Sequence, residues 1–398
     1  MIDDTPHHNQ RWHRTAVAFI VLIGTVSLFS DMTYEGGRSI AGPYLAQFGA
    51  SGLLVGFVAG FGEFIGYALR FVSGYLGDRS GRYWPIVFVG YAFNLFALPL
   101  LALAGGLPVV ILLLLLERVG KATRTPIRDA MLASAAGSRG LGWGFGLHEA
   151  LDQTGAMIGP LAMALILGLG GTYRLGFGFL AIPAVIGYAV LVAARLRYPT
   201  RGRLTIKAQL PKRWTFGPAY WRFTAASAVL AAGYADFALI AFNFGKAGAL
   251  SPVWIPIMYA IAMGAAGAAS WVSGTWFDRR GMIVPAMGLG MAALATPLVF
   301  LGGFDAIVAG VALWGVGMGI QDSVLKAVIG GMVDPERRAT AFGLFDLVRG
   351  SAWFAGSLLL GFLYDVNLAA LAIISVLLQL VAVIIMLTSK GSAAHSVG

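Results

Sequence analysis

Long apolar stretches separated by short polar loops run through nearly the whole sequence, and they decide what it can fold into. Only 12% of the residues are charged and 58% are hydrophobic, whereas a soluble domain is about one quarter charged. A helix needs about 20 consecutive apolar residues to cross the hydrocarbon core of a bilayer. The 398 residues therefore have room for about twelve such spans. We expect an all-α membrane protein with twelve transmembrane helices.

The expected spans fall into two sets of six, separated by one longer polar segment. The first set lies near 17–48, 52–76, 84–104, 108–135, 141–168 and 175–195. The second set lies near 219–245, 252–277, 283–303, 306–331, 339–363 and 367–388. The segment between them is basic and rich in proline, as linkers are. The predicted organisation is a tail (1–15), a six-helix bundle (16–195), a linker (196–218), a second bundle (219–388) and a tail (389–398).

The net charge of +10 is distributed unevenly along the chain. Most lysines and arginines lie in the N-terminal tail, in the loops that follow even-numbered spans, and in the linker. The opposite loops contain only Arg174 and Lys246. Because cytoplasmic loops carry the excess of Lys and Arg, we expect a multi-pass protein of the inner (plasma) membrane with both termini in the cytoplasm. The basicity reflects topology and predicts no nucleic-acid partner.

A polar turn between the second and third spans has a copy in the second half of the chain. The first copy reads Gly74-Tyr-Leu-Gly-Asp-Arg-Ser-Gly-Arg82, and the second reads Gly274-Thr-Trp-Phe-Asp-Arg-Arg-Gly281. The second copy has Met282 where the first ends on arginine. A turn repeated once in each half indicates an internal duplication.

The pattern G-x-x-x-D-R-x-G-R resembles the signature of the loop between helices 2 and 3 in the major facilitator superfamily. The resemblance implies two pseudo-symmetric six-helix bundles, alternating access of a central site to the two sides of the membrane, and a monomer. It also implies a conformational latch at the turn, although a basic turn that only fixes topology would look similar. The latch residues are Gly74, Asp78, Arg79, Gly81, Arg82, Asp278 and Arg279.

The fifth span contains Gly155-Ala-Met-Ile-Gly159-Pro160. Small residues four apart allow close helix approach, and proline bends a helix. The sequence looks like the G-x-x-x-G-P motif of proton-coupled antiporters in the same superfamily. Ordinary helix packing is the alternative interpretation.

Ionisable residues inside spans are costly and point to function. The candidates for proton coupling are two carboxylates in the first span and two in the fifth: Asp31, Glu35, Glu149 and Asp152. In the superfamily, helices 1, 4, 7 and 10 line the central cavity, with helices 5 and 11 close by. The polar residues that the resemblance places at this substrate cavity are Tyr34, Arg38, Glu117, Arg118, Lys121, Asp236, Gln321, Lys326, Asp346 and Arg349.

Two further basic residues of the fourth span, Arg124 and Arg128, are expected to extend toward the cytoplasmic headgroups. Asp129 is expected in a fixed structural ion pair. Leu114-x-x-x-Arg118 resembles the arginine motif of proton-coupled members, but Lys121 and Ala122 replace the Gln and Gly that usually follow it.

No Walker loop and no cysteine are present, so the sequence predicts neither an ATPase nor a thiol enzyme. We expect no enzymatic activity, cofactor or resident metal. The preferred hypothesis is proton-coupled efflux of a small anionic, zwitterionic or amphipathic organic molecule. The alternatives are a proton symporter for a carboxylate or sugar, a lipid translocase, a metal-ion exporter and a substrate-sensing receptor.

Overall fold

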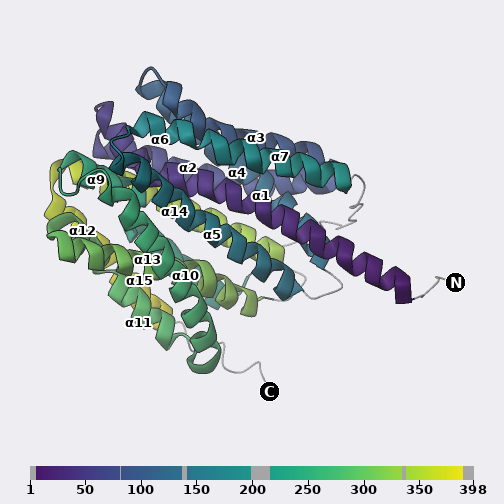
Figure 1. Ribbon diagram of the computed structural model, residues 1–398. Helices are drawn as coiled ribbons and strands as arrows, with labels where there is room; N and C mark the ends of the chain where they lie inside the picture. The colour runs from purple at the N-terminus through teal and green to yellow at the C-terminus, as the bar shows by residue number, and fades with distance from the viewer. Residues whose placement is uncertain (1–5, 81, 137–140, 199–215, 334–337, 389–398) are drawn as a thin grey trace. The chain divides into compact units, whose positions relative to one another are not determined.

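The computed structural model describes residues 6–80, 82–136, 141–198, 216–333 and 338–388 (Figure 1). All regular elements in these ranges are helices. Eleven segments of the described chain are long and apolar enough to cross a membrane. The remaining expected span is the long helix α4, Leu107–Ala136, which is interrupted by several charged residues. The all-α membrane architecture is therefore confirmed.

The helices follow one another along the chain with short connections. In the first half they are α1 (Pro6–Gln47), α2 (Gly52–Ser80), α3 (Tyr83–Leu100), the 3₁₀ turn η1 (Leu101–Leu103), α4 (Leu107–Ala136), α5 (Leu141–Gly168), α6 (Tyr173–Phe179) and α7 (Ala181–Arg197). In the second half they are α8 (Pro218–Gly233), α9 (Phe237–Lys246), α10 (Trp254–Arg280), α11 (Ile283–Ala292), α12 (Ala295–Leu301), α13 (Phe304–Gly331), α14 (Arg338–Val366) and α15 (Leu368–Thr388).

Three expected spans, the sixth, seventh and ninth, are each divided into two helices. Pro183 lies in the first turn of α7 and Pro297 in the first turn of α12, where proline is tolerated but cannot continue a preceding helix. The division between α8 and α9 has a different cause. The Asp236 side chain accepts a hydrogen bond from the backbone N–H of Ala238 at 2.9 Å and so caps α9. The helix α1 also begins earlier than the expected first span, at Pro6.

The chain forms two compact units. Unit 1 comprises Met1–Gly37, Ala68–Ala162 and Leu169–Ala208. Within it α3 packs against α4 and α7. Its apolar core joins side chains of α1, α3, α4 and α7, including Val26, Tyr91, Leu95, Ile127 and Leu191. These helices provide the framework that holds the charged residues of α1 and α4.

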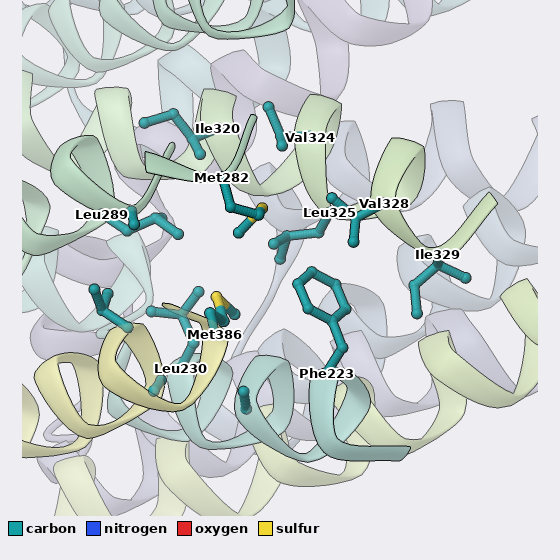
Figure 2. Packing of buried hydrophobic residues seen from close by; sticks show 14 of the residues in the cluster. Phe223, Leu230, Met282, Leu289, Ile320, Val324, Leu325, Val328, Ile329 and Met386 are labelled. Atoms are coloured by element: carbon teal, nitrogen blue, oxygen red, sulfur yellow. The ribbon is translucent and has the colours of Figure 1, made fainter. Parts of the chain in front are cut away.

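Unit 2 comprises Arg38–Tyr67, Met163–Gly168 and Gln209–Gly398. Within it α10 packs against α13, and α8 packs against α14 and α15. Figure 2 shows the core between α8, α11, α13 and α15, where Phe223, Leu230, Met282, Leu325 and Met386 converge. The boundary between the units falls inside α1, α2 and α5. The expected domain boundaries at 195/196 and 218/219 stay a prediction.

Candidate functional site

Arg124 of α4 is the centre of a charged network in unit 1. It is 1% exposed. Its Nε donates to Asn94 Oδ1 at 3.0 Å, and one terminal nitrogen donates to the Tyr91 hydroxyl at 3.2 Å. The other terminal nitrogen lies 3.8 Å from a carboxylate oxygen of Asp31 on α1. The expectation that Arg124 reaches the headgroups is wrong, because partners on α1 and α3 compensate its charge inside the protein.

Glu117, one turn before Lys121 on α4, extends the network along the same helix. Glu117 is 3% exposed and accepts a hydrogen bond from the Asn94 amide at 2.5 Å. Asn94 therefore bridges the acid at 117 and the guanidinium at 124. One asparagine thus connects charges that are two turns apart on α4.

Tyr34 of α1 contacts two cations of α4. Its hydroxyl accepts a hydrogen bond from Arg118, and the Lys121 ammonium lies 3.4 Å from the centre of its ring. Lys121 also interacts electrostatically with Asp31 and Glu35. The geometry thus brings together predicted residues of the first and fourth spans. Both cations of α4 interact with the same tyrosine, Tyr34.

Asp152 of α5 lies in contact with the Asp31 carboxyl group. One oxygen of Asp152 is buried without a hydrogen-bond partner. Arg128 interacts electrostatically with Asp152 and donates to the Ser27 hydroxyl at 3.3 Å. The predicted carboxylates of the first and fifth spans therefore meet as a buried pair flanked by Arg124 and Arg128.

Two residues of this region differ from that pattern. Glu149 is exposed and accepts a hydrogen bond from Gln153 of its own helix at 2.9 Å, and it interacts electrostatically with Asp152 of the pair. Asp129 forms the expected local ion pair, with an oxygen 2.8 Å from Arg128. That ion pair keeps Arg128 inside the helix bundle instead of extending toward the headgroups.

The glycines of the G-x-x-x-G-P motif allow α5 to lie directly on α1. A Cβ atom added at Gly155 would meet the Leu28 carbonyl oxygen, and one added at Gly159 would meet the Met32 carbonyl oxygen. Only glycine permits this approach. The close contact places Asp152, one turn before Gly155, next to α1.

In unit 2, Arg38 of α1 forms an ion pair with Asp236. The Arg38 guanidinium nitrogen lies 3.3 Å from Asp236 Oδ2, and both side chains are largely buried. The other oxygen of Asp236 caps α9. A charged residue of α1 is thereby attached to the interruption between α8 and α9, and discontinuous membrane helices commonly form transporter binding sites.

Arg349 of α14 occupies a second polar position in unit 2. It is 3% exposed, donates to Gln321 Oε1 at 3.0 Å and donates to the Tyr67 hydroxyl at 3.4 Å. Its guanidinium lies 5.5 Å from the centre of the Trp353 ring. Like those of Arg124, its hydrogen-bond partners are uncharged, and the carboxylates of Glu63, Asp322 and Asp346 interact with it electrostatically.

A row of aromatic rings continues from Arg349. Trp353 packs against Tyr234 with ring centres 5.8 Å apart, and Tyr234 packs against Trp314 at 5.7 Å. The Trp314 indole nitrogen donates to the Ala235 carbonyl at 2.8 Å. Predicted residues Gln321 and Arg349 thus adjoin an aromatic wall. Asp346 is half-buried, one turn before Arg349.

Most of the expected latch lies outside what the structure describes. Gly81 is not described at all, and for Gly74, Asp78, Arg79 and Asp278 only the helical backbone is described. The side chain of Lys326 is likewise not described. Arg82 and Arg279 are exposed.

A different polar contact is present at the opposite end of α2. Asp365 of α14 accepts hydrogen bonds from the backbone N–H groups of Gly52 and Leu53 at 2.8 and 2.9 Å.

Sequence reasoning missed the contribution of α3. No residue of its expected span is among the predicted site residues, yet Tyr91 and Asn94 hold Arg124 and Glu117. The signal was weak, since one asparagine and one tyrosine in an apolar run of 18 residues carry no charge. Their three-residue spacing places them on one helical face, which is the only hint the sequence offered.

Membrane-spanning helices with ion pairs and polar networks buried between them are typical of proteins that move solutes across a bilayer. The family model of the Major Facilitator Superfamily matches residues 21–357. The chain belongs to this superfamily and is a secondary transporter of a small molecule, not an enzyme.

Relatives extend over almost the full length. A Mycobacterium tuberculosis protein of uncharacterised function is 37% identical over 379 residues, covering 94% of this chain and 93% of the relative. An MFS-type transporter of Methanocaldococcus jannaschii, also uncharacterised, is 26% identical over 365 residues, covering 87% and 89%.

Solved structures show the same fold at low sequence identity. A nucleoside transporter aligns with a TM-score of 0.78 and 12% identity over 94% of this chain and all of its own. A peptide transporter aligns at 0.71 and 16%, over 93% and 94%. A bacterial homologue of the iron transporter ferroportin aligns at 0.69 and 15%, over 94% and 99%. These three transporters carry different solutes, so the shared fold does not specify the substrate.

Proposed function

We propose that this protein is a proton-coupled exporter of a small anionic, zwitterionic or amphipathic organic molecule. It would operate by alternating access, as a monomer in the inner (plasma) membrane with both termini in the cytoplasm. The bundles would be residues 16–195 and 219–388. The contact between the Asp31 and Asp152 carboxyl groups in unit 1 is the observation that supports proton coupling most directly.

Two carboxylates in contact repel each other when both are ionised, and a proton bound between them would remove that repulsion. Arg124 and Arg128 flank the pair and favour the ionised form. The same groups can therefore bind a proton in one conformation and interact with arginine in another. A site that binds a coupling ion differently in two conformations is what secondary transport requires.

Proton binding from the outside would neutralise this pair and release the arginines from it. The released positive charge would then alter how an anionic group of the substrate is held. Protonation would in this way weaken substrate binding on the outer side and favour return of the carrier. The direction of transport, export in exchange for protons, is further supported by the G-x-x-x-G-P motif that positions Asp152 against α1.

The Asp365 contact in unit 2 suggests how one conformation is held closed. A carboxylate at the N-terminus of a helix satisfies backbone donors and interacts favourably with the helix dipole. Here a residue of α14 in the second half of the chain caps α2 in the first half. We propose that this cap opens when the carrier opens at that end.

Everted membrane vesicles containing the transporter test the coupling. Their lumen is acidified, the pH gradient is followed with acridine orange, and a panel of metabolites and drugs is added outside. A proton-coupled exporter exchanges the solute for lumenal protons, so its substrate restores the fluorescence. Asp152→Asn should abolish this response while solute counterflow, which needs no gradient, persists. Asp305→Asn, at an exposed acid in the first turn of α13, is the matched control.

Other results would redirect the proposal. A response only to solute loaded inside the lumen indicates symport, and a response to divalent iron or manganese indicates metal export. Movement of fluorescent phospholipid between leaflets indicates a lipid translocase. Solute export that continues at the same rate without a pH gradient would contradict proton coupling.

A further inference from the structure

Among the described residues of α14, four buried polar atoms have no hydrogen-bond partner: Asp346 Oδ1, Arg349 Nε, Trp353 Nε1 and Ser357 Oγ. The four residues follow one another at intervals of three, four and four positions, so they share one face of the helix. Buried polar atoms are almost always paired, because an unpaired one lowers the stability of the folded state. One carboxylate acceptor, two nitrogen donors and one hydroxyl left unpaired along one helical face require an explanation.

The side chains that carry the two donors are fixed in place. The terminal nitrogens of Arg349 bind Gln321 and Tyr67, which leaves Nε as its unpaired donor. Trp353 is 3% exposed and packs against Tyr234, so its indole N–H cannot rotate toward another partner without disturbing that packing. The donors are therefore preorganised, a condition that lowers the entropic cost of binding a ligand.

The charged groups near this face favour a ligand that carries both a positive and a negative group. Arg349 interacts electrostatically with the carboxylates of Glu63, Asp322 and Asp346, so acids outnumber arginine among the described side chains here. An unpaired carboxylate oxygen at Asp346 accepts best from a cationic nitrogen. The two unpaired donors, by contrast, match the two oxygens of a carboxylate.

We propose that this face of α14 is a subsite for an aromatic zwitterion of amino-acid size. The amino group of the ligand donates to Asp346 Oδ1, and its carboxylate accepts from Arg349 Nε and Trp353 Nε1. Its ring extends the aromatic row that begins with Trp353 and Tyr234. The inference rests on the proposed transport function, because the ligand bound here is the transported substrate. The atoms are shielded from solvent, so the ligand enters when α14 separates from its neighbours during alternating access.

Thermal unfolding of the purified full-length protein in detergent tests the charge requirement. Three probes are compared at millimolar concentration: phenylalanine, a zwitterion; phenylalanine amide, a cation; and N-acetylphenylalanine, an anion. A ligand of the folded state raises the melting temperature by mass action. Phenylalanine should raise it more than either singly charged analogue. Equal stabilisation by one analogue, or no stabilisation by phenylalanine, would overturn the proposal.

A pair of tryptophan variants separates binding from folding. Trp353→Phe removes a donor that has no protein partner, so the melting temperature without ligand should fall only through the loss of ring packing, while phenylalanine affinity falls about fivefold or more. Trp314→Phe removes a donor that binds the Ala235 carbonyl, so it should lower the melting temperature and leave affinity unchanged. Full phenylalanine affinity in Trp353→Phe would contradict the subsite.

These binding measurements use no proton gradient. Loss of phenylalanine binding therefore rejects the subsite without affecting proton coupling, whereas a negative vesicle experiment rejects proton coupling and leaves the subsite standing.

Discussion

The two units bury their arginines in different ways. In unit 1, Arg124 is held by a carboxylate and two polar residues, and further acids and bases of α1, α4 and α5 surround it. In unit 2, Arg349 is held by an amide and a hydroxyl and adjoins a row of aromatic rings. In the mechanism proposed above, the first environment exchanges protons and charge partners, and in the proposed subsite the second offers donors and an acceptor to a ligand.

This difference suggests a division of labour inside one transporter. A network of opposite charges has several states of similar free energy, which suits a coupling ion. A fixed arginine beside aromatic rings has one arrangement, which suits recognition of a particular ligand. Substitutions that are matched between the units test whether the difference is real.

The largest effect is expected from Arg124→Met. Removing one partner of a buried ion pair costs about 3–5 kcal/mol, because the other charge stays buried and uncompensated. The variant leaves the Asp31 carboxylate buried without its Arg124 partner. Arg349→Met leaves the uncharged groups of Gln321 and Tyr67 without their donor and should cost less, about 1–3 kcal/mol. Chemical denaturation in detergent micelles measures both losses.

Two controls accompany the arginine pair. Arg197→Gln, at an exposed end of α7, should change the free energy of unfolding by no more than about 0.5 kcal/mol. The double variant Arg124→Met with Asp31→Asn should be more stable than Arg124→Met alone, because the uncompensated charge is gone. Equal losses at positions 124 and 349 would remove the distinction between the units.

Gly155→Ala should have the next largest effect. The added methyl group collides with the Leu28 backbone and separates α5 from α1. Overpacking of this kind costs about 1–3 kcal/mol, and gradient-driven transport should fall because Asp152 moves away from Asp31. Gly264→Ala in α10 is the control, because its added Cβ has no neighbour within 4 Å and alanine favours the helix. Unchanged transport in Gly155→Ala would contradict the importance of this approach.

The smallest effect is expected when one of two tyrosine hydroxyls, that of Tyr34 or that of Tyr234, is removed. The Tyr34 hydroxyl accepts from Arg118, whereas the Tyr234 hydroxyl donates to the Trp314 carbonyl. Hydrogen bonds to charged groups contribute about 1.5–3 kcal/mol and neutral ones about 0.5–1.5 kcal/mol. Tyr34→Phe should therefore destabilise the protein by about 1 kcal/mol more than Tyr234→Phe, measured by the same denaturation. The reverse order would show that charge does not distinguish the two environments.

The sequence predicted the helical membrane fold and the majority of the residues that gather in the two units. Ionisable residues stand out in apolar spans because each one is costly there, so Asp31, Lys121 and Arg349 were readily found. The sequence could not predict that Glu149 is exposed, since both faces of α5 carry polar residues. Nor could it predict that the seventh span is divided at Asp236, because one aspartate in an apolar run reads equally well as a cavity residue or a cap.

The sequence by itself determined the class of the protein, because the length and apolar character of the segments leave few alternatives to spanning helices. It also determined the family, through short motifs at helix ends. Only the tertiary structure decided which charges are partners: Arg124 with Asp31, Arg38 with Asp236, and Asp31 with Asp152. The physical reason is that a helical pattern fixes which residues share a face, while the rotation and contact of neighbouring helices fix what that face meets.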